Sequence, residues 1–251
     1  MSLFDLFRSL KSLLGFATGS SKLASKSGTA CVVVGMERSK TYGECPGSDA
    51  DAAAMSKALG RYGGVAAMTN RQATRAAVRK ALQDAVKKDL AIFYYSGHGG
   101  QEHVSAGGGM TEFLCLDDGP FHDTEIWDAI SKAKGRVVCI FDCCHSGNMY
   151  RVASVEPVRV QITNTGFSFR MLSETPMALS ASSGILVWSG CPADSYSYGD
   201  PTGGVFTKGL LSGLGQFATY DSVWRKAKSA ARAQKPVRTV IGSGFSGPVF
   251  R

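Results

Sequence analysis

The sequence predicts an α/β fold built around a largely parallel sheet. Several short runs rich in β-branched and aromatic residues show no alternation of polar and apolar positions, which is typical of strands buried on both faces. Segments with helical spacing of apolar residues separate these runs, as in βαβ units. The 251-residue chain is 44% hydrophobic and 19% charged, so it is long enough and apolar enough to bury a large core.

Strands and helices are expected to alternate from residue 30 onward. Strands are predicted at 30–36, 64–69, 90–96, 112–116, 136–142, 176–182, 185–189 and 237–242. Helices are predicted at 49–60, 71–88, 123–133, 205–214 and 220–234. The helix over 71–88 is expected to begin at an Asn70 cap and to bury Val78, Leu82 and Val86.

The first residues, MSLFDLFRSLKSLLGF, form a separate segment. Asp5, Arg8 and Lys11 interrupt its helically spaced apolar residues, so it lacks the continuous apolar stretch of a signal peptide or membrane span. We expect an amphipathic helix that docks on its own domain, on a partner or on a membrane surface. Residues 17–29 are Gly/Ser-rich and resemble a linker. We therefore divide the chain into an N-terminal segment with its linker, residues 1–28, and one folded domain, residues 29–251.

Charge and cysteine content narrow the partners and the compartment. The net charge is +8, and much of the excess lies in two clusters within predicted helices, one of Arg71, Arg75 and Arg79 and one over 225–235. Because no nucleic-acid motif accompanies them, we interpret both as solvated helix faces and expect no nucleic-acid partner. The seven cysteines form no CxxC pair, which argues against a zinc ribbon and favours a reducing, cytoplasmic location.

Two motifs end core strands of the predicted sheet. YYSGHGG presents His98 and FDCCHSG presents Cys144, each at the carboxyl end of a strand, where ligands gather in such sheets. Cys144 is therefore a candidate nucleophile, and His98 a candidate base and acid. The backbone N–H groups of Gly99 and Cys144 are candidate donors to an oxyanion. The sequence indicates no third member of a triad.

The cysteine motif has other possible roles. A single cysteine is more often a buried structural thiol, but the strand-end position and the matched His98 favour catalysis by Cys144. Cys143 is expected to pack in the core and His145 to have a structural role. Adjacent residues do not converge easily on one tetrahedral ion, so no zinc site is expected here.

Residues two positions apart on a strand share a face. Asp142 is therefore expected on the side of Cys144, and Ser96 on the side of His98. A carboxylate beside the nucleophile opposes formation of a thiolate, so its more plausible use is to bind a cationic group of the substrate. This placement predicts cleavage after basic residues.

The pairing of YYSGHG with DCCHSG resembles the metacaspases, a branch of the caspase-like cysteine peptidases. The resemblance covers roughly residues 29–250 and includes PGSDADAAAM (46–55) and GVFTKGLL (204–211). It implies a caspase-like α/β/α sandwich with a mostly parallel central sheet. Within it, residues 29–150 would resemble a large subunit, residues 151–175 would form an irregular linker, and residues 176–251 would resemble a small subunit.

The resemblance also implies a function for specific residues. It implies an endopeptidase that cleaves protein or peptide substrates after Arg or Lys, with Asp51, Ser96 and Asp142 lining the pocket for the basic side chain. Separately, we expect a monomer. Around Asp51 the family pattern is altered, because Ser48 and Ala50 stand where Cys and Asn are usual. Self-cleavage would fall in basic linkers, although ordinary solvated charges and an uncut chain fit equally well. The candidate positions are Lys22, Lys26, Arg151, Arg159 and Arg170.

Many metacaspases are activated by calcium, and the matching region here is LDDGPFHDTEIW. The family's D-D-E becomes Asp123, Thr124 and Glu125, and Asp123 is the one weak candidate ligand. A hard cation prefers six to eight oxygen ligands, so we expect weak or absent calcium binding and no required cofactor. Two functions remain open: an active Arg/Lys-specific cysteine endopeptidase, or a catalytically weak caspase-like scaffold that acts as an interaction module.

Overall fold

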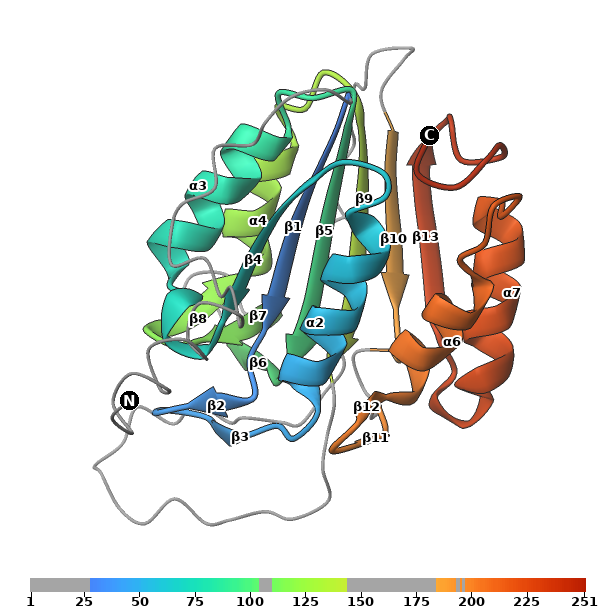
Figure 1. Ribbon diagram of the computed structural model, residues 1–251. Helices are drawn as coiled ribbons and strands as arrows, with labels where there is room; N and C mark the ends of the chain where they lie inside the picture. The colour runs from blue at the N-terminus through green and yellow to red at the C-terminus, as the bar shows by residue number, and fades with distance from the viewer. Residues whose placement is uncertain (1–27, 104–109, 144–183, 193–194, 196) are drawn as a thin grey trace, which may run out of the picture.

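The central element is a six-stranded sheet with the order β13-β10-β9-β5-β1-β4 (Figure 1). The computed structural model describes residues 28–103, 110–143, 184–192, 195 and 197–251. Five strands run parallel, and β13 pairs antiparallel with β10 at one edge. The strands are β1 Thr29–Gly35, β4 Gly64–Thr69, β5 Leu90–Gly97, β9 Arg136–Cys143, β10 Gly184–Ser189 and β13 Val237–Gly242.

Helices cover both faces of this sheet, so the predicted α/β/α fold class is confirmed. Figure 1 shows α3 and α4 on one face and α2, α6 and α7 on the other, and the two buried clusters divide in the same way. The helices are α2 Ser48–Leu59, α3 Arg75–Ala85, α4 Asp123–Ile130, α6 Val205–Gly213 and α7 Tyr220–Ala230, with short 3₁₀ helices η1 Asn70–Gln72 and η2 Arg232–Gln234.

The alternation of side chains along each strand explains the uninterrupted apolar runs. In β5, Phe93 belongs to the core beneath α3 and α4, whereas Ile92 and Tyr94 belong to the core beneath α2, α6 and α7. Because both faces are covered, every position needs an apolar side chain until the strand reaches its carboxyl end. Polar residues then appear, as Ser96 in β5 and Asp142 in β9.

Three smaller sheets lie near the carboxyl edge of the central sheet (Figure 1). They are β6 Gly99–His103 with β7 Met110–Leu116 and β8 Gly119–His122, β2 Arg38–Ser39 with β3 Gly43–Glu44, and β11 Gly199–Asp200 with β12 Gly203–Gly204. The strand predicted at 112–116 therefore exists, but it belongs to a separate antiparallel sheet. The chain turns back directly after His98, so β6 can pair with β7 instead of continuing the parallel sheet.

The helix predicted at 71–88 begins later, and Asn70 does not cap it. Thr74 is the N-cap, and its hydroxyl accepts a hydrogen bond from Ala77 N at 3.3 Å. Asn70 has a left-handed φ of 47° and uses its amide in tertiary contacts, donating to Asp49 Oδ2 at 2.7 Å and accepting from Arg38 N at 2.7 Å. Tertiary hydrogen bonds therefore outweigh the local capping preference.

The cluster of Arg71, Arg75 and Arg79 is only partly a solvated helix face. Arg75 and Arg79 both form ion pairs with Glu125 of α4, whereas Arg71 lies exposed in η1.

Some predicted regions lie outside the described residues, namely residues 1–27, the linker 151–175 and the strand at 176–182. The division of the domain into large-subunit-like and small-subunit-like regions therefore stays a prediction. In the described part of the chain no helix is long and apolar enough to cross a membrane.

Candidate active site

The candidate site lies at the carboxyl ends of β5 and β9, which are neighbours in the sheet. Their parallel register places Ser96 beside Asp142 and Gly97 beside Cys143. His98 directly follows Gly97 in the chain. Cys144 and His145 lie outside the described residues. Cys143, which precedes Cys144, is paired with Gly97, which precedes His98. Cys143 is buried in the core beneath α3 and α4, as predicted.

His98 is anchored through its backbone and oriented through its ring. Its carbonyl oxygen accepts hydrogen bonds from Tyr95 OH at 2.6 Å and from Cys115 N at 3.0 Å. Its Nε2 lies 2.9 Å from the carbonyl oxygen of Glu44 in β3. Because a carbonyl only accepts, this contact requires a proton on Nε2 and leaves Nδ1 of a neutral ring as the basic nitrogen.

The Glu44 carbonyl is an orienting partner that sequence analysis did not find. A backbone oxygen has no residue-specific signature, and Glu44 lies 54 positions before His98. Only the folding of the β2–β3 hairpin over the strand ends brings the two together. The arrangement supplies what a third triad member would supply, namely a fixed ring orientation and tautomer.

The Gly99 N–H faces away from the neighbouring strand. Gly99 is paired with Leu114, and the adjacent ladder bond runs from Cys115 N to His98 O. In an antiparallel pair this pattern makes Gly99–Leu114 a position without ladder hydrogen bonds. The N–H predicted to serve an oxyanion is therefore not used by β7, whereas the predicted N–H of Cys144 lies outside the described residues.

The three residues predicted to bind a basic side chain are brought together. Ser96 and Asp142 lie on the sheet face that α2 covers, and Asp51 projects toward them from the first turn of α2. Ser96 Oγ donates to Asp51 Oδ2 at 2.8 Å. All three side chains are buried, with exposed fractions of 2% for Asp51 and 0% for Ser96 and Asp142.

Further donors from the C-terminal part of the chain hold the two carboxylates. Gly204 N lies 3.0 Å from both Asp51 oxygens. Asp142 Oδ2 accepts from Thr207 N at 3.0 Å and from Thr207 Oγ1 at 2.7 Å, while Asp142 Oδ1 accepts from Ser197 Oγ at 2.6 Å. Gly204 and Thr207 lie in the motif GVFTKGLL, which could have indicated their role at the site. Nothing in the sequence indicated Ser197.

Two consecutive glycines lie directly against the carboxylates. A Cβ on Gly203 would lie 2.3 Å from Asp51 Oδ1, and a Cβ on Gly204 would lie 2.2 Å from Asp142 Oδ2. Gly203 also has a left-handed φ of 124°. The close approach of β12 to the acidic pair therefore requires glycine at both positions.

The acidic pair has a strong electrostatic consequence. Burial, and after it the nearby Asp142 carboxylate, raises the pKa of Asp51 to about 7, against the opposing effect of the Gly204 and Ser96 hydrogen bonds. The described donors to Asp51 are a hydroxyl and a peptide N–H, which are both neutral. A cation that reached this pair would favour full ionisation of both carboxylates.

Asp123, the candidate metal ligand, has protein partners. Its Oδ1 accepts from Thr111 Oγ1 at 2.7 Å and from Thr124 N at 2.8 Å. Burial is the main cause that raises the pKa of Asp123. Within the described ranges no three His, Cys, Asp or Glu side chains gather as a metal site. The expectation about calcium stays a prediction.

Replacing Asp51 by Asn should change how stability depends on pH. The folded-state pKa of about 7 lies above the usual unfolded value near 4, so the contribution of Asp51 to stability should fall as pH rises from about 4 to 7. Asn cannot ionise, and it retains an oxygen for Gly204 N. Asp51→Asn should therefore be more stable than wild type at pH 8, with a difference that shrinks toward pH 4.

Urea unfolding at four pH values between 4 and 8 measures this difference. Asp84→Asn is the matched control, because Lys87 and Lys80 lower the pKa of Asp84 and its replacement should cost stability at pH 8 instead. A difference between Asp51→Asn and wild type that stays constant over this range would contradict the pKa argument.

Replacing Gly204 by Ala should disturb the acidic pair without straining the backbone, because the φ of Gly204 is −72°. The added methyl group would overlap Asp142 Oδ2, and such overpacking costs about 1–3 kcal/mol. Gly215→Ala is the control, since a Cβ there meets nothing within 4 Å. Equal free energies of unfolding for the two variants would argue against close contact between β12 and Asp142.

Comparisons with known proteins show the fold and the family of the chain. The chain resembles protein GSU0716 from Geobacter sulfurreducens in its crystal structure, with 24% identity, a TM-score of 0.69 and coverage of 88% of this chain and 98% of that one; at this identity the likeness shows the fold alone. No match is found among curated protein sequences. The caspase domain family matches residues 29–239. The chain therefore belongs to the caspase domain family of cysteine peptidases, as its metacaspase-like motifs indicated.

Proposed function

We propose that the chain is a cysteine endopeptidase that cleaves after Arg or Lys, with Cys144 as the nucleophile and His98 as the general base and acid. The supporting observation is the buried Asp51–Ser96–Asp142 cluster, which lies at the same strand ends as His98. Membership of the caspase domain family supports a protein or peptide substrate. The acidic cluster supports a basic side chain before the scissile bond.

The proposed chemistry uses groups whose roles fit their surroundings. The Cys144 thiolate attacks the scissile carbonyl carbon, and the N–H groups of Gly99 and Cys144 stabilise the resulting oxyanion. His98 takes the thiol proton and then donates it to the leaving amine. Water, deprotonated by His98, hydrolyses the thioester and restores the thiol. The Glu44 carbonyl keeps His98 Nδ1 available for these proton transfers.

The acidic cluster supports selectivity for a cation on electrostatic grounds. Burial, and after it repulsion from the Asp142 carboxylate, raises the pKa of Asp51, so ionising both carboxylates in the empty pocket is unfavourable. A guanidinium or ammonium group would neutralise the pair and add charge-assisted hydrogen bonds to its oxygens. A neutral side chain of the same shape would leave the buried carboxylates without that charge, which costs roughly a hundredfold or more in kcat/KM.

A peptide series tests the proposal directly. Peptides with Arg, Lys, citrulline or Asp before the scissile bond are assayed with and without calcium, using wild type, Cys144→Ala, His98→Ala and Asp142→Asn. Arg and Lys peptides should be cleaved, the citrulline and Asp peptides should be poor substrates, and both dyad variants should be inactive. Asp142→Asn should lose most of the preference for Arg over citrulline. Asp200→Asn, which alters an exposed carboxylate bound to Lys208, should keep it.

The outcomes separate the parts of the proposal. Cleavage of Asp peptides without cleavage of Arg peptides would refute the pocket assignment while leaving a cysteine peptidase. Absence of turnover under both calcium conditions would favour an interaction scaffold. Incubation of wild type beside Cys144→Ala tests self-cleavage at Lys22, Lys26, Arg151, Arg159 or Arg170, because only the active chain should be cut.

Binding of a basic ligand should release a proton from Asp51. With a pKa of about 7, Asp51 is largely protonated at pH 6 in the empty pocket, and a bound cation should ionise it. Calorimetric titration of Cys144→Ala with arginine methyl ester, in buffers of different ionisation enthalpy, should give about one proton released per ligand at pH 6 and almost none at pH 8.5. Proton release that persists in the Asp51→Asn background would assign the proton to another group.

A further inference from the structure

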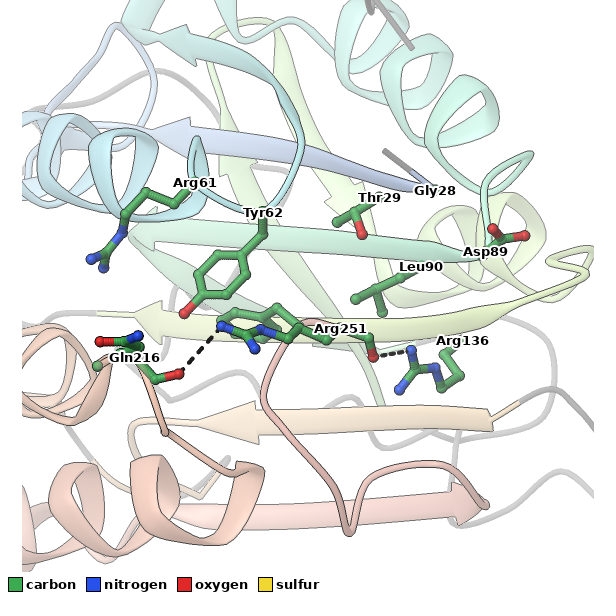
Figure 2. A pocket seen from close by; sticks show the side chains of 11 residues that line it. Gly28, Thr29, Arg61, Tyr62, Asp89, Leu90, Arg136, Gln216 and Arg251 are labelled. Atoms are coloured by element: carbon green, nitrogen blue, oxygen red, sulfur yellow. Dashed lines mark hydrogen bonds between the residues drawn. The ribbon is translucent and has the colours of Figure 1, made fainter. Parts of the chain in front are cut away.

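A cavity of about 600 Å³ lies at the opposite end of the sheet from the candidate active site. The residues that line it include Thr29, Leu90 and Arg136, which are the first residues of β1, β5 and β9. The cavity therefore lies at the amino ends of these parallel strands (Figure 2). Its volume is within the range of small-molecule sites, which is roughly 300–1,000 Å³. Neither the family motifs nor the proposed peptidase chemistry uses this cavity.

Three arginines line the cavity. They are Arg61, Arg136 and Arg251, and Asp89 supplies the one acidic side chain among the described residues that line it. The α2 and α6 helices end close by in the chain, and a helix C-terminus carries roughly half a negative charge. Because a guanidinium group donates hydrogen bonds and accepts none, these three arginines suit a ligand that carries acceptor oxygens, such as an anion.

The arginines are positioned by hydrogen bonds to main-chain oxygens. Arg136 donates to the backbone oxygens of Gly244, at 2.8 Å, and of Arg251. Arg251 donates to the backbone oxygen of Gln216 at 3.2 Å, and Figure 2 shows Arg251 linked in this way to Gln216 and to Arg136. Arg61 donates through Nε to Ala58 O at 3.3 Å.

Arg136 in particular is held in place before any ligand binds. It is partly buried, and its stem passes Gly244, where a Cβ would lie 2.7 Å from Arg136 Cδ. A guanidinium carries five N–H donors in a planar fork that matches phosphate oxygens. The described contacts of these three arginines use only part of those donors, so the cavity offers preorganised donors to an anionic ligand.

The remaining wall of the cavity is aromatic. Tyr62 packs edge-on against Phe250, with 5.3 Å between the ring centroids, and both rings line the cavity. Phe217, beside the lining residue Gln216, is 88% exposed. An anion alone would leave this wall uncovered, and a single phosphate would fill little of the volume.

We propose that this cavity binds a small organic molecule that carries two or more phosphate groups. The phosphates contact Arg136, Arg251 and Arg61, and the organic part lies against Tyr62 and Phe250. The site is independent of the proposed peptidase activity, since the described catalytic candidates lie at the other edge of the sheet.

Calorimetric titration of the full chain with inorganic triphosphate and with adenosine triphosphate, at roughly 0.15 M salt, tests the proposal. Both probes should bind saturably. Arg136→Gln should weaken binding roughly tenfold and Arg61→Gln roughly threefold, as expected for lost charge-assisted hydrogen bonds. Asp89→Asn should strengthen binding. Arg71→Gln, which removes an exposed arginine of η1 at the other edge of the sheet, should have no effect.

The two probes and a second variant make the result decisive. Tighter binding of adenosine triphosphate than of inorganic triphosphate would support the organic part on the aromatic wall. Equal binding of the two probes would contradict that part of the proposal. If Arg136→Gln does not fold, Arg136→Lys keeps the charge but loses the fork and should still weaken binding. Absence of saturable binding, or equal weakening by Arg61→Gln and Arg71→Gln, would overturn the proposal.

Discussion

The contact between two buried carboxylates and their distant donors organises the carboxyl edge of this fold. Removing Asp51 and Asp142 from water is costly unless their oxygens receive well-aligned hydrogen bonds. Those bonds come from residues far along the chain, since Gly204 lies 153 positions from Asp51 and Thr207 lies 65 positions from Asp142. The pair therefore fastens α2 and β9 to the segment that begins α6.

This arrangement joins stability to the proposed specificity. Burial, together with the nearby Asp142 carboxylate, raises the pKa of Asp51 and makes ionisation of the empty pocket unfavourable, so a cationic substrate would be favoured there. Functional sites often contain such locally unfavourable arrangements, which the rest of the fold stabilises. Here the support comes from a continuous sheet covered on both faces, whose apolar strands place Ser96 and Asp142 beside each other in register.

The two edges of the sheet carry sites with different charged side chains. Acidic side chains gather at the carboxyl edge, and arginines gather around the cavity at the amino edge. Parallel strands place all their amino ends together and all their carboxyl ends together, so residues that follow or precede different strands converge in space. A chain with a net charge of +8 can in this way present an acidic pocket and a basic cavity at separate places.

Much of the fold could be predicted from the sequence, because a strand buried on both faces requires an apolar residue at every position. The runs at 30–36, 90–96 and 136–142 each correspond to a central strand, and the polar residues that end β5 and β9 marked the candidate site. The prediction failed where local preference competed with tertiary contacts, as at Asn70, whose side chain binds Asp49 and the Arg38 backbone instead of capping a helix.

By itself the sequence determined the parallel sheet, its order of strands and helices along the chain, and the placement of the His98 and Cys144 motifs after strands. Only the tertiary structure decided how Asp51 meets Asp142, that the Glu44 carbonyl orients His98, and that three arginines share one cavity. The physical reason is that periodicity records which face of an element is buried, whereas hydrogen bonds to backbone groups across long stretches of chain leave no pattern in the residues that make them.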